Sequence, residues 1–83
     1  MKDPLNDLDF LAKIVVGIGE VSEVTHVAPR QIRYWEEKGY IQSLSNQDSK
    51  TRRYDYYQIK KIMLIKEFLD QGFTLESAVT KTE

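Results

Sequence analysis

Two short helical segments joined by a turn constrain the fold of this chain more than any other feature. Residues 19–25 suit a helix of under two turns that buries Val21 and Val24, and residues 29–38 suit a second helix that ends at Gly39. Two short helices with a brief turn between them predict a helix-turn-helix.

A basic and aromatic segment follows this helix pair. Residues 40–44 suit a strand that enters a hairpin, residues 45–49 are all turn formers, and residues 52–54 suit the returning strand. The expected fold is therefore mainly α, a winged helix-turn-helix with a small two-stranded β-hairpin wing over about residues 41–54.

Two more helices complete the single domain that 83 residues allow. Asp55 is a suitable N-cap for a long helix from residue 56 to about residue 71, and Thr74 is a suitable N-cap for a short helix over residues 75–81. In the helix over residues 29–38, Trp35 is assigned to the core because a lone tryptophan usually supplies buried area in a small domain.

The N-terminal part has two interpretations. Residues 1–17 form an extension ahead of the domain over residues 18–83, and leucines at helical spacing predict a docking or dimerising helix over residues 4–15. The alternatives are a frayed terminus and, over residues 14–16, a short strand that leads into the domain.

Charge is divided unevenly along the chain. Residues 30–66 hold nine basic and four acidic residues, a balance of +5, and the remainder holds three basic and nine acidic residues, a balance of −6, which together give the net charge of −1. Phosphate binding needs a basic face rather than a basic protein, so this division is compatible with double-stranded DNA as a partner.

The helix over residues 29–38 carries candidate DNA contacts. Arg30 and Gln31 occupy its first turn, which in a helix-turn-helix points into the major groove, where arginine pairs with guanine and glutamine with adenine. Arg33 and Tyr34 lie one turn further and suit phosphate contacts. The alternative for Arg33 is a surface ion pair with Glu37.

The returning strand of the wing supplies the other candidates. Side chains alternate along a strand, so only one of Arg52 and Arg53 is expected to face DNA directly. Tyr54 either contacts a phosphate or packs under the hairpin. The candidate DNA-binding residues are thus Arg30, Gln31, Arg33, Tyr34, Arg52, Arg53 and Tyr54.

The sequence argues against catalysis, cofactor binding and metal binding. His26 is the only histidine, cysteine is absent, and Gly17 and Gly19 lack the rest of a phosphate-binding loop. The acids Glu36 and Glu37 suit a solvated helix face. No signal peptide is evident and the apolar run over residues 14–18 is too short to span a bilayer, so we expect a cytoplasmic protein with no membrane partner.

At these residues the chain resembles the DNA-binding domain of MerR-type transcription regulators. The resemblance covers about residues 18–80 and rests on five motifs in the family's order, Ile18-Gly19-Glu20-Val21, Ile32-Arg33-Tyr34-Trp35-Glu36, Gly39-Tyr40-Ile41, Arg52-Arg53-Tyr54 and Gln71-Gly72-Phe73-Thr74-Leu75. Within the family, residues 30–34 look most like the glutamine-responsive nitrogen-regulator branch.

The resemblance implies a homodimer that binds an inverted-repeat promoter site and meets RNA polymerase through the promoter. It implies recognition-helix contacts at Arg30, Arg33 and Tyr34, and wing contacts at residues 52–54. The family continues into a dimerising helix and an effector domain, so the expectation is either a DNA-binding fragment or a small stand-alone protein that dimerises in some other way, such as through residues 4–15.

The chain departs from the family's pattern at the turn and in the wing. His26 stands where a turn glycine is usual, and histidine tolerates a left-handed backbone better than most residues. Ser43 and Ser45 stand near the usual proline and arginine, and a glycine near Lys50 is missing, which predicts a looser wing that binds DNA more weakly.

Two other functions remain open from the sequence. One is a small excisionase-like architectural factor that bends DNA, which would share the winged fold and suit a short chain. The other is a protein-interaction module with weak DNA binding, which the acidic N-terminal segment and the altered wing favour.

Overall fold

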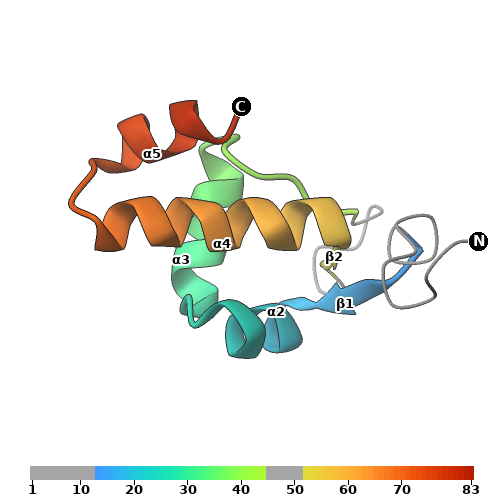
Figure 1. Ribbon diagram of the computed structural model, residues 1–83. Helices are drawn as coiled ribbons and strands as arrows, with labels where there is room; N and C mark the ends of the chain where they lie inside the picture. The colour runs from blue at the N-terminus through green and yellow to red at the C-terminus, as the bar shows by residue number, and fades with distance from the viewer. Residues whose placement is uncertain (1–12, 45–51) are drawn as a thin grey trace, which may run out of the picture.

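The computed structural model describes residues 13–44 and 52–83 (Figure 1). Its elements are β1 (Val15–Gly17), α2 (Ile18–Thr25), α3 (Pro29–Glu37), β2 (Arg53–Asp55), α4 (Tyr56–Asp70) and α5 (Leu75–Lys81). The four helices expected within residues 18–83 are each present to within one residue at either end, and a two-stranded antiparallel sheet accompanies them. The expected mainly helical, winged helix-turn-helix class is confirmed.

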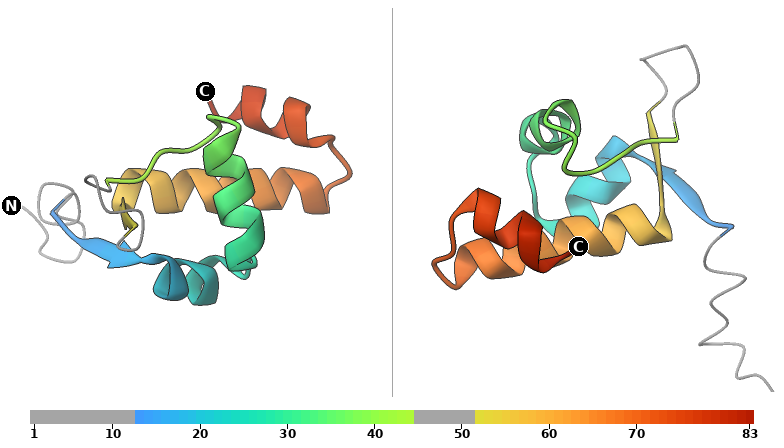
Figure 2. Two further views of the ribbon diagram at one scale, coloured as in Figure 1. Left: turned by 180° about the vertical axis from the view of Figure 1, so that it is seen from behind. Right: turned by 90° about the horizontal axis from the view of Figure 1, so that it is seen from above.

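The helices are arranged around α4, the longest of them. In Figure 1, α3 crosses behind α4 and α5 lies above it. Seen from above (Figure 2), α3 and the start of β2 point to the same side of the molecule, and the α4–α5 pair lies on the other side. The helix and the strand that carry the candidate contacts therefore share one side.

The helix boundaries follow from local chemistry. Asp55 accepts a hydrogen bond from the Gln58 N–H at 3.0 Å, and Thr74 accepts one from the Ser77 N–H at 3.2 Å. Each bond satisfies one of the backbone N–H groups in the first turn of the helix, which have no carbonyl acceptor within the helix itself. Both N-caps expected from the sequence are confirmed.

The turn between α2 and α3 depends on His26. This residue ends α2 with a φ of 61°, the left-handed conformation, and its N–H donates to the Ser22 carbonyl at 2.8 Å. Pro29 then begins α3, where its fixed φ suits the first helical position and its missing N–H costs nothing.

The core lies between the helices and β2, since most of its buried residues come from α2, α3, β2, α4 and α5. Trp35 is 1% exposed, which confirms its assignment to the core. Val24 was expected to be buried and is instead 59% exposed, because α2 packs through Val21 and Thr25, which are four residues apart on one face. Among residues 13–44 and 52–83, the buried apolar residues are Val21, Val27, Ile32, Trp35, Ile41, Tyr54, Ile62, Ile65, Ala78 and Val79.

The sheet differs from the expected hairpin in the partner of its second strand. β2 pairs with β1 in register Val15↔Asp55, Val16↔Tyr54 and Gly17↔Arg53, so the strand interpretation of residues 14–16 is confirmed in essence and the pairing of residues 52–54 with a strand over residues 40–44 is wrong. Residues 42–44 make one backbone hydrogen bond to β2, from the Leu44 N–H to the Arg53 carbonyl at 2.7 Å.

The reason is that side chains of the helices hold the segment over residues 40–44. The Gln42 N–H donates to the Gln58 amide oxygen at 2.9 Å, and the Ser43 hydroxyl donates to Glu36 at 3.0 Å. A backbone donor that is satisfied by a helix side chain cannot also extend a strand ladder. The expected turn over residues 45–49 and most of the expected helix over residues 4–15 lie outside the described residues.

Candidate nucleic-acid interface

The candidate residues of α3 lie on its solvent side. Ile32 and Trp35 are buried and anchor the helix, which leaves the intervening positions outside. Tyr34 is 46% exposed, and the Lys38 ammonium lies 5.7 Å from the centre of its ring. The exposed residues of α3 include all four sequence candidates, Arg30, Gln31, Arg33 and Tyr34.

The positive charges of α3 are not consumed by ion pairs. Within residues 13–44 and 52–83, the ion pairs join Arg52 to Glu36 and Lys66 to Asp70. The alternative interpretation of Arg33, a pair with Glu37, is therefore not realised in this structure. A guanidinium without a protein partner remains available to an external anion such as a phosphate.

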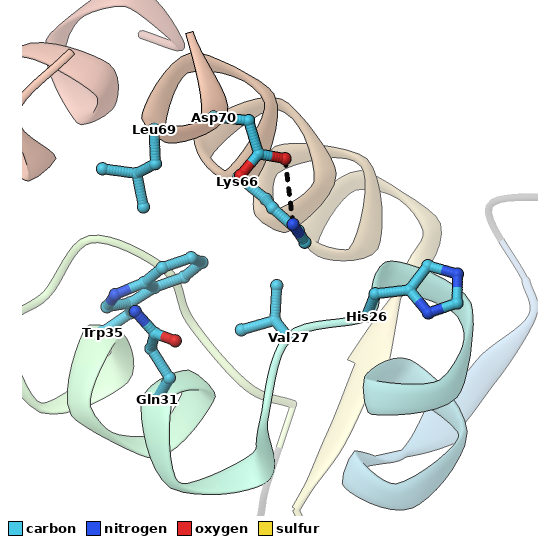
Figure 3. A pocket seen from close by; sticks show the side chains of 7 residues that line it. All are labelled: His26, Val27, Gln31, Trp35, Lys66, Leu69 and Asp70. Carbon is cyan, nitrogen blue, oxygen red and sulfur yellow. Dashed lines mark hydrogen bonds and ion pairs between the residues drawn. The ribbon is translucent and has the colours of Figure 1, made fainter. Parts of the chain in front are cut away.

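Gln31 differs from the other candidates in its direction. It lines an open depression of about 280 Å³ between α3 and the end of α4, and Figure 3 shows its side chain running up beside Trp35. Lys66 and Asp70 on the far wall pair with each other at 2.9 Å. Gln31 thus lies towards α4. The two charged side chains across the depression, Lys66 and Asp70, are paired with each other.

Arg52, directly before β2, and Arg53, its first residue, have different surroundings. Arg53 is exposed, whereas the Arg52 Nε lies 3.8 Å from the Glu36 Oε2 and the Arg52 side chain is 25% exposed. Arg52 and Tyr54 both approach Glu36, so they share the side of the strand that faces α3, and Arg53 points the other way. The expected alternation is confirmed.

Tyr54 adopts the packing alternative. Its side chain has no exposed surface, and its hydroxyl donates to the Glu36 Oε1 at 2.7 Å. Burial raises the pKa of the Tyr54 hydroxyl, and the hydrogen bond to Glu36 and the charge of that carboxylate raise it further, against the opposing charges of Arg52 and Arg33. A buried hydroxyl that is held protonated serves the fold and offers no surface to a phosphate.

Glu36 was missed by the sequence interpretation, which assigned it to a solvated helix face. Its side chain is 19% exposed and accepts hydrogen bonds from Tyr54 and Ser43. Its position four residues after the buried Ile32 was the available signal, because residues at that spacing lie on one helix face. Glu37, one residue on, is exposed.

Other kinds of site find no support in the part of the chain that the structure describes. Among these residues, no group of three or more His, Cys, Asp or Glu side chains gathers to hold a metal ion. Across the same two ranges, 13–44 and 52–83, no helix combines the length and the apolar character needed to cross a membrane.

Comparison with known proteins decides the family. Residues 17–82 match the family described as MerR HTH family regulatory protein. The chain belongs to this family. The MerR resemblance identified from the five motifs is thereby confirmed, and the membership agrees with the expectation of a DNA-binding regulatory protein rather than an enzyme.

Relatives of this MerR-family chain are named as HTH-type transcriptional regulators. It is 35% identical over 66 residues to the HTH-type transcriptional regulator TnrA of Bacillus subtilis (strain 168), a match that covers 80% of this chain and 59% of the relative. It is 33% identical over 58 residues to the HTH-type transcriptional regulator GlnR of Bacillus anthracis and of Bacillus cereus, covering 70% of this chain and 44% of each relative. The chain spans about half the length of these curated relatives. Similarity to TnrA and GlnR supports the assignment to the nitrogen-regulator branch of the family.

Proposed function

We propose that this MerR-family domain reads duplex DNA sequence-specifically for transcription regulation, with α3 as the recognition helix in the major groove and the wing on the backbone. The observation that carries the proposal is the division of α3 into a buried face and a solvent face. Ile32 and Trp35 anchor the helix, and the guanidinium groups of Arg30 and Arg33 have no protein partner within the described residues.

The proposed roles follow the direction of each side chain. Arg30 lies in the first turn of α3 and reads a base, with Gln31 beside it in a secondary role because that side chain lies towards α4. Arg33 and Tyr34 contact phosphates from the recognition helix. Arg53, exposed at the start of β2, contacts a phosphate from the wing.

The proposal includes two copies of the chain on one inverted repeat. This arrangement is what the resemblance to MerR-type regulators implies, and an inverted repeat would reveal it, because a repeated half-site mirrors the two-fold symmetry of a protein dimer. RNA polymerase would be met through the promoter, in the cytoplasm.

The test is a binding selection from random duplex DNA, at low and at physiological salt, followed by affinity measurements on the enriched site. Arg33→Ala is expected to weaken binding about equally on all sequences and to reduce the slope of log K against log salt by about one. Arg30→Ala is expected to relax the preference at one base pair, at a cost of about 1–3 kcal/mol.

Lys81→Ala is the matched control. Lys81 is also a basic residue, but it lies on α5 with its ammonium 4.8 Å from the centre of the Phe73 ring, on the α4–α5 side of the molecule (Figure 2). Its removal should leave the affinity and the salt slope unchanged. Equal affinities for wild type, Arg30→Ala and Arg33→Ala would refute these roles.

The other outcomes of the selection identify the competing functions. Salt-sensitive binding without an enriched sequence would favour an architectural factor that bends DNA. No binding at either salt concentration would favour a protein-interaction module.

A further inference from the structure

One carboxylate connects the recognition helix to both ends of the wing. The Glu36 Oε1 accepts a hydrogen bond from the Tyr54 hydroxyl at 2.7 Å, and the Oε2 accepts one from the Ser43 hydroxyl at 3.0 Å. The same Oε2 lies 3.8 Å from the Arg52 Nε. Ser43 lies before residues 45–51 in the chain, and Arg52 and Tyr54 lie after them, so α3 and the two described ends of the wing meet at one carboxylate.

Backbone bonding alone connects the wing ends weakly. Within the described residues, the Leu44 N–H to Arg53 carbonyl bond is the backbone hydrogen bond that joins residues 40–44 to β2. The Gln42 N–H is held by the Gln58 side chain, which belongs to α4 and not to the recognition helix. Within the described residues, the side chain of Glu36 thus joins α3 to Ser43, Arg52 and Tyr54 through three polar contacts.

The charge of Glu36 is unexpected at this place. A carboxylate beside the groups that would meet phosphates repels DNA on electrostatic grounds. Arg33 and Arg52 both lie near enough to oppose the rise in the pKa of Tyr54, so the carboxylate lies among candidate contacts from both elements. An acid here needs a role that outweighs its repulsion of DNA.

We propose that Glu36 is a positioning residue for DNA binding, which holds the wing against α3 so that helix and wing reach the duplex together. This inference rests on the proposed function. It makes the geometry of the interface depend on a residue that itself contacts no DNA.

The inference and the electrostatic effect predict opposite signs for the same substitution. Glu36→Ala removes one negative charge together with every contact of the carboxylate, and we expect the Kd for the enriched duplex to rise about tenfold, equivalent to about 1.4 kcal/mol. Glu37→Ala removes the same charge from the next, exposed position of α3, and we expect an unchanged or lower Kd.

A conservative variant separates positioning from charge. In Glu36→Gln the amide oxygen can still accept from Tyr54 and the amide nitrogen can donate to Ser43, so most of the affinity lost in Glu36→Ala should return. A purely electrostatic role requires the two neutral variants to bind alike.

Tyr54→Phe keeps the charge and the buried ring but removes one of the connections, which guards against misfolding of Glu36→Ala. Its Kd should rise about threefold, with less than additive effects when it is combined with Glu36→Ala, since the two remove one shared contact. All affinities are measured at a temperature at which circular dichroism shows each variant folded.

The pattern of the loss identifies its cause. Loss of a wing contact should reduce the salt slope of Glu36→Ala by about one and leave the base preference of α3 unchanged. Binding of Glu36→Ala as tight as that of Glu37→Ala would overturn the inference while the proposed function stands. Absence of duplex binding by the wild type would instead overturn the proposed function.

Discussion

Replacing His26 with glycine should stabilise the domain. His26 is the non-glycine residue with positive φ in the described part of the chain, and its φ of 61° lies in the left-handed region. That conformation costs a residue with a Cβ about 1–2 kcal/mol, and glycine avoids most of this cost. The imidazole is exposed and makes no hydrogen bond within the described residues, so little native contact is lost.

The gain is reduced by the unfolded state. Glycine is more flexible in the unfolded chain, which offsets about 0.4–1 kcal/mol of the relief. The net expectation for His26→Gly is a free energy of unfolding higher by about 0.5–1 kcal/mol, or a rise of several degrees in Tm for a domain of this size. Thermal and urea unfolding monitored by circular dichroism measure both quantities.

His26→Ala is the control, because it removes the same imidazole but keeps the Cβ. It should be less stable than His26→Gly, since the backbone cost remains. Equal stabilities for the glycine and alanine variants would refute the reasoning, because they would show that relief of the left-handed backbone does not exceed the cost of a more flexible unfolded chain.

Two further predictions concern stability. Because the pKa of Tyr54 is raised in the folded state, its contribution to the free energy of unfolding is fully present below the ordinary tyrosine pKa of about 10 and is lost as pH rises above it. The free energy of unfolding measured from pH 8 to pH 11 should therefore decline, and the decline should be smaller in Tyr54→Phe. An equal decline in the variant would contradict the assignment. Asp55→Ala should lower the free energy of unfolding by about 1 kcal/mol, because the hydrogen bond to the Gln58 N–H is lost. Asp55→Asn should keep most of this stability, because asparagine can also cap a helix. Equal losses for the two variants in a urea titration would exclude the capping role.

The sequence predicted the helices closely because their signals are local. Asp55 and Thr74 cap the helices that follow them, and Gly72 takes a φ of 100° in the turn after α4. Ile32 and Trp35, three residues apart, correctly identified the buried face of α3. Each of these depends on residues within one or two helical turns of one another.

The wing was predicted less well because its contacts join distant residues. The returning strand was located correctly, but it pairs with β1, about forty residues earlier in the chain, rather than with residues 40–44. The sequence does not show which segment pairs with β2, because the choice depends on which backbone donors the helices have already satisfied.

The candidate site shows the same division. Helical periodicity in the sequence was enough to predict that α3 presents Arg30, Arg33 and Tyr34 opposite a buried face. The burial of Tyr54 and the contacts of Glu36 with the wing became evident from the packing of the folded chain. The two residues are far apart in sequence, and a hydrogen bond between them exists only once packing has brought β2 against α3.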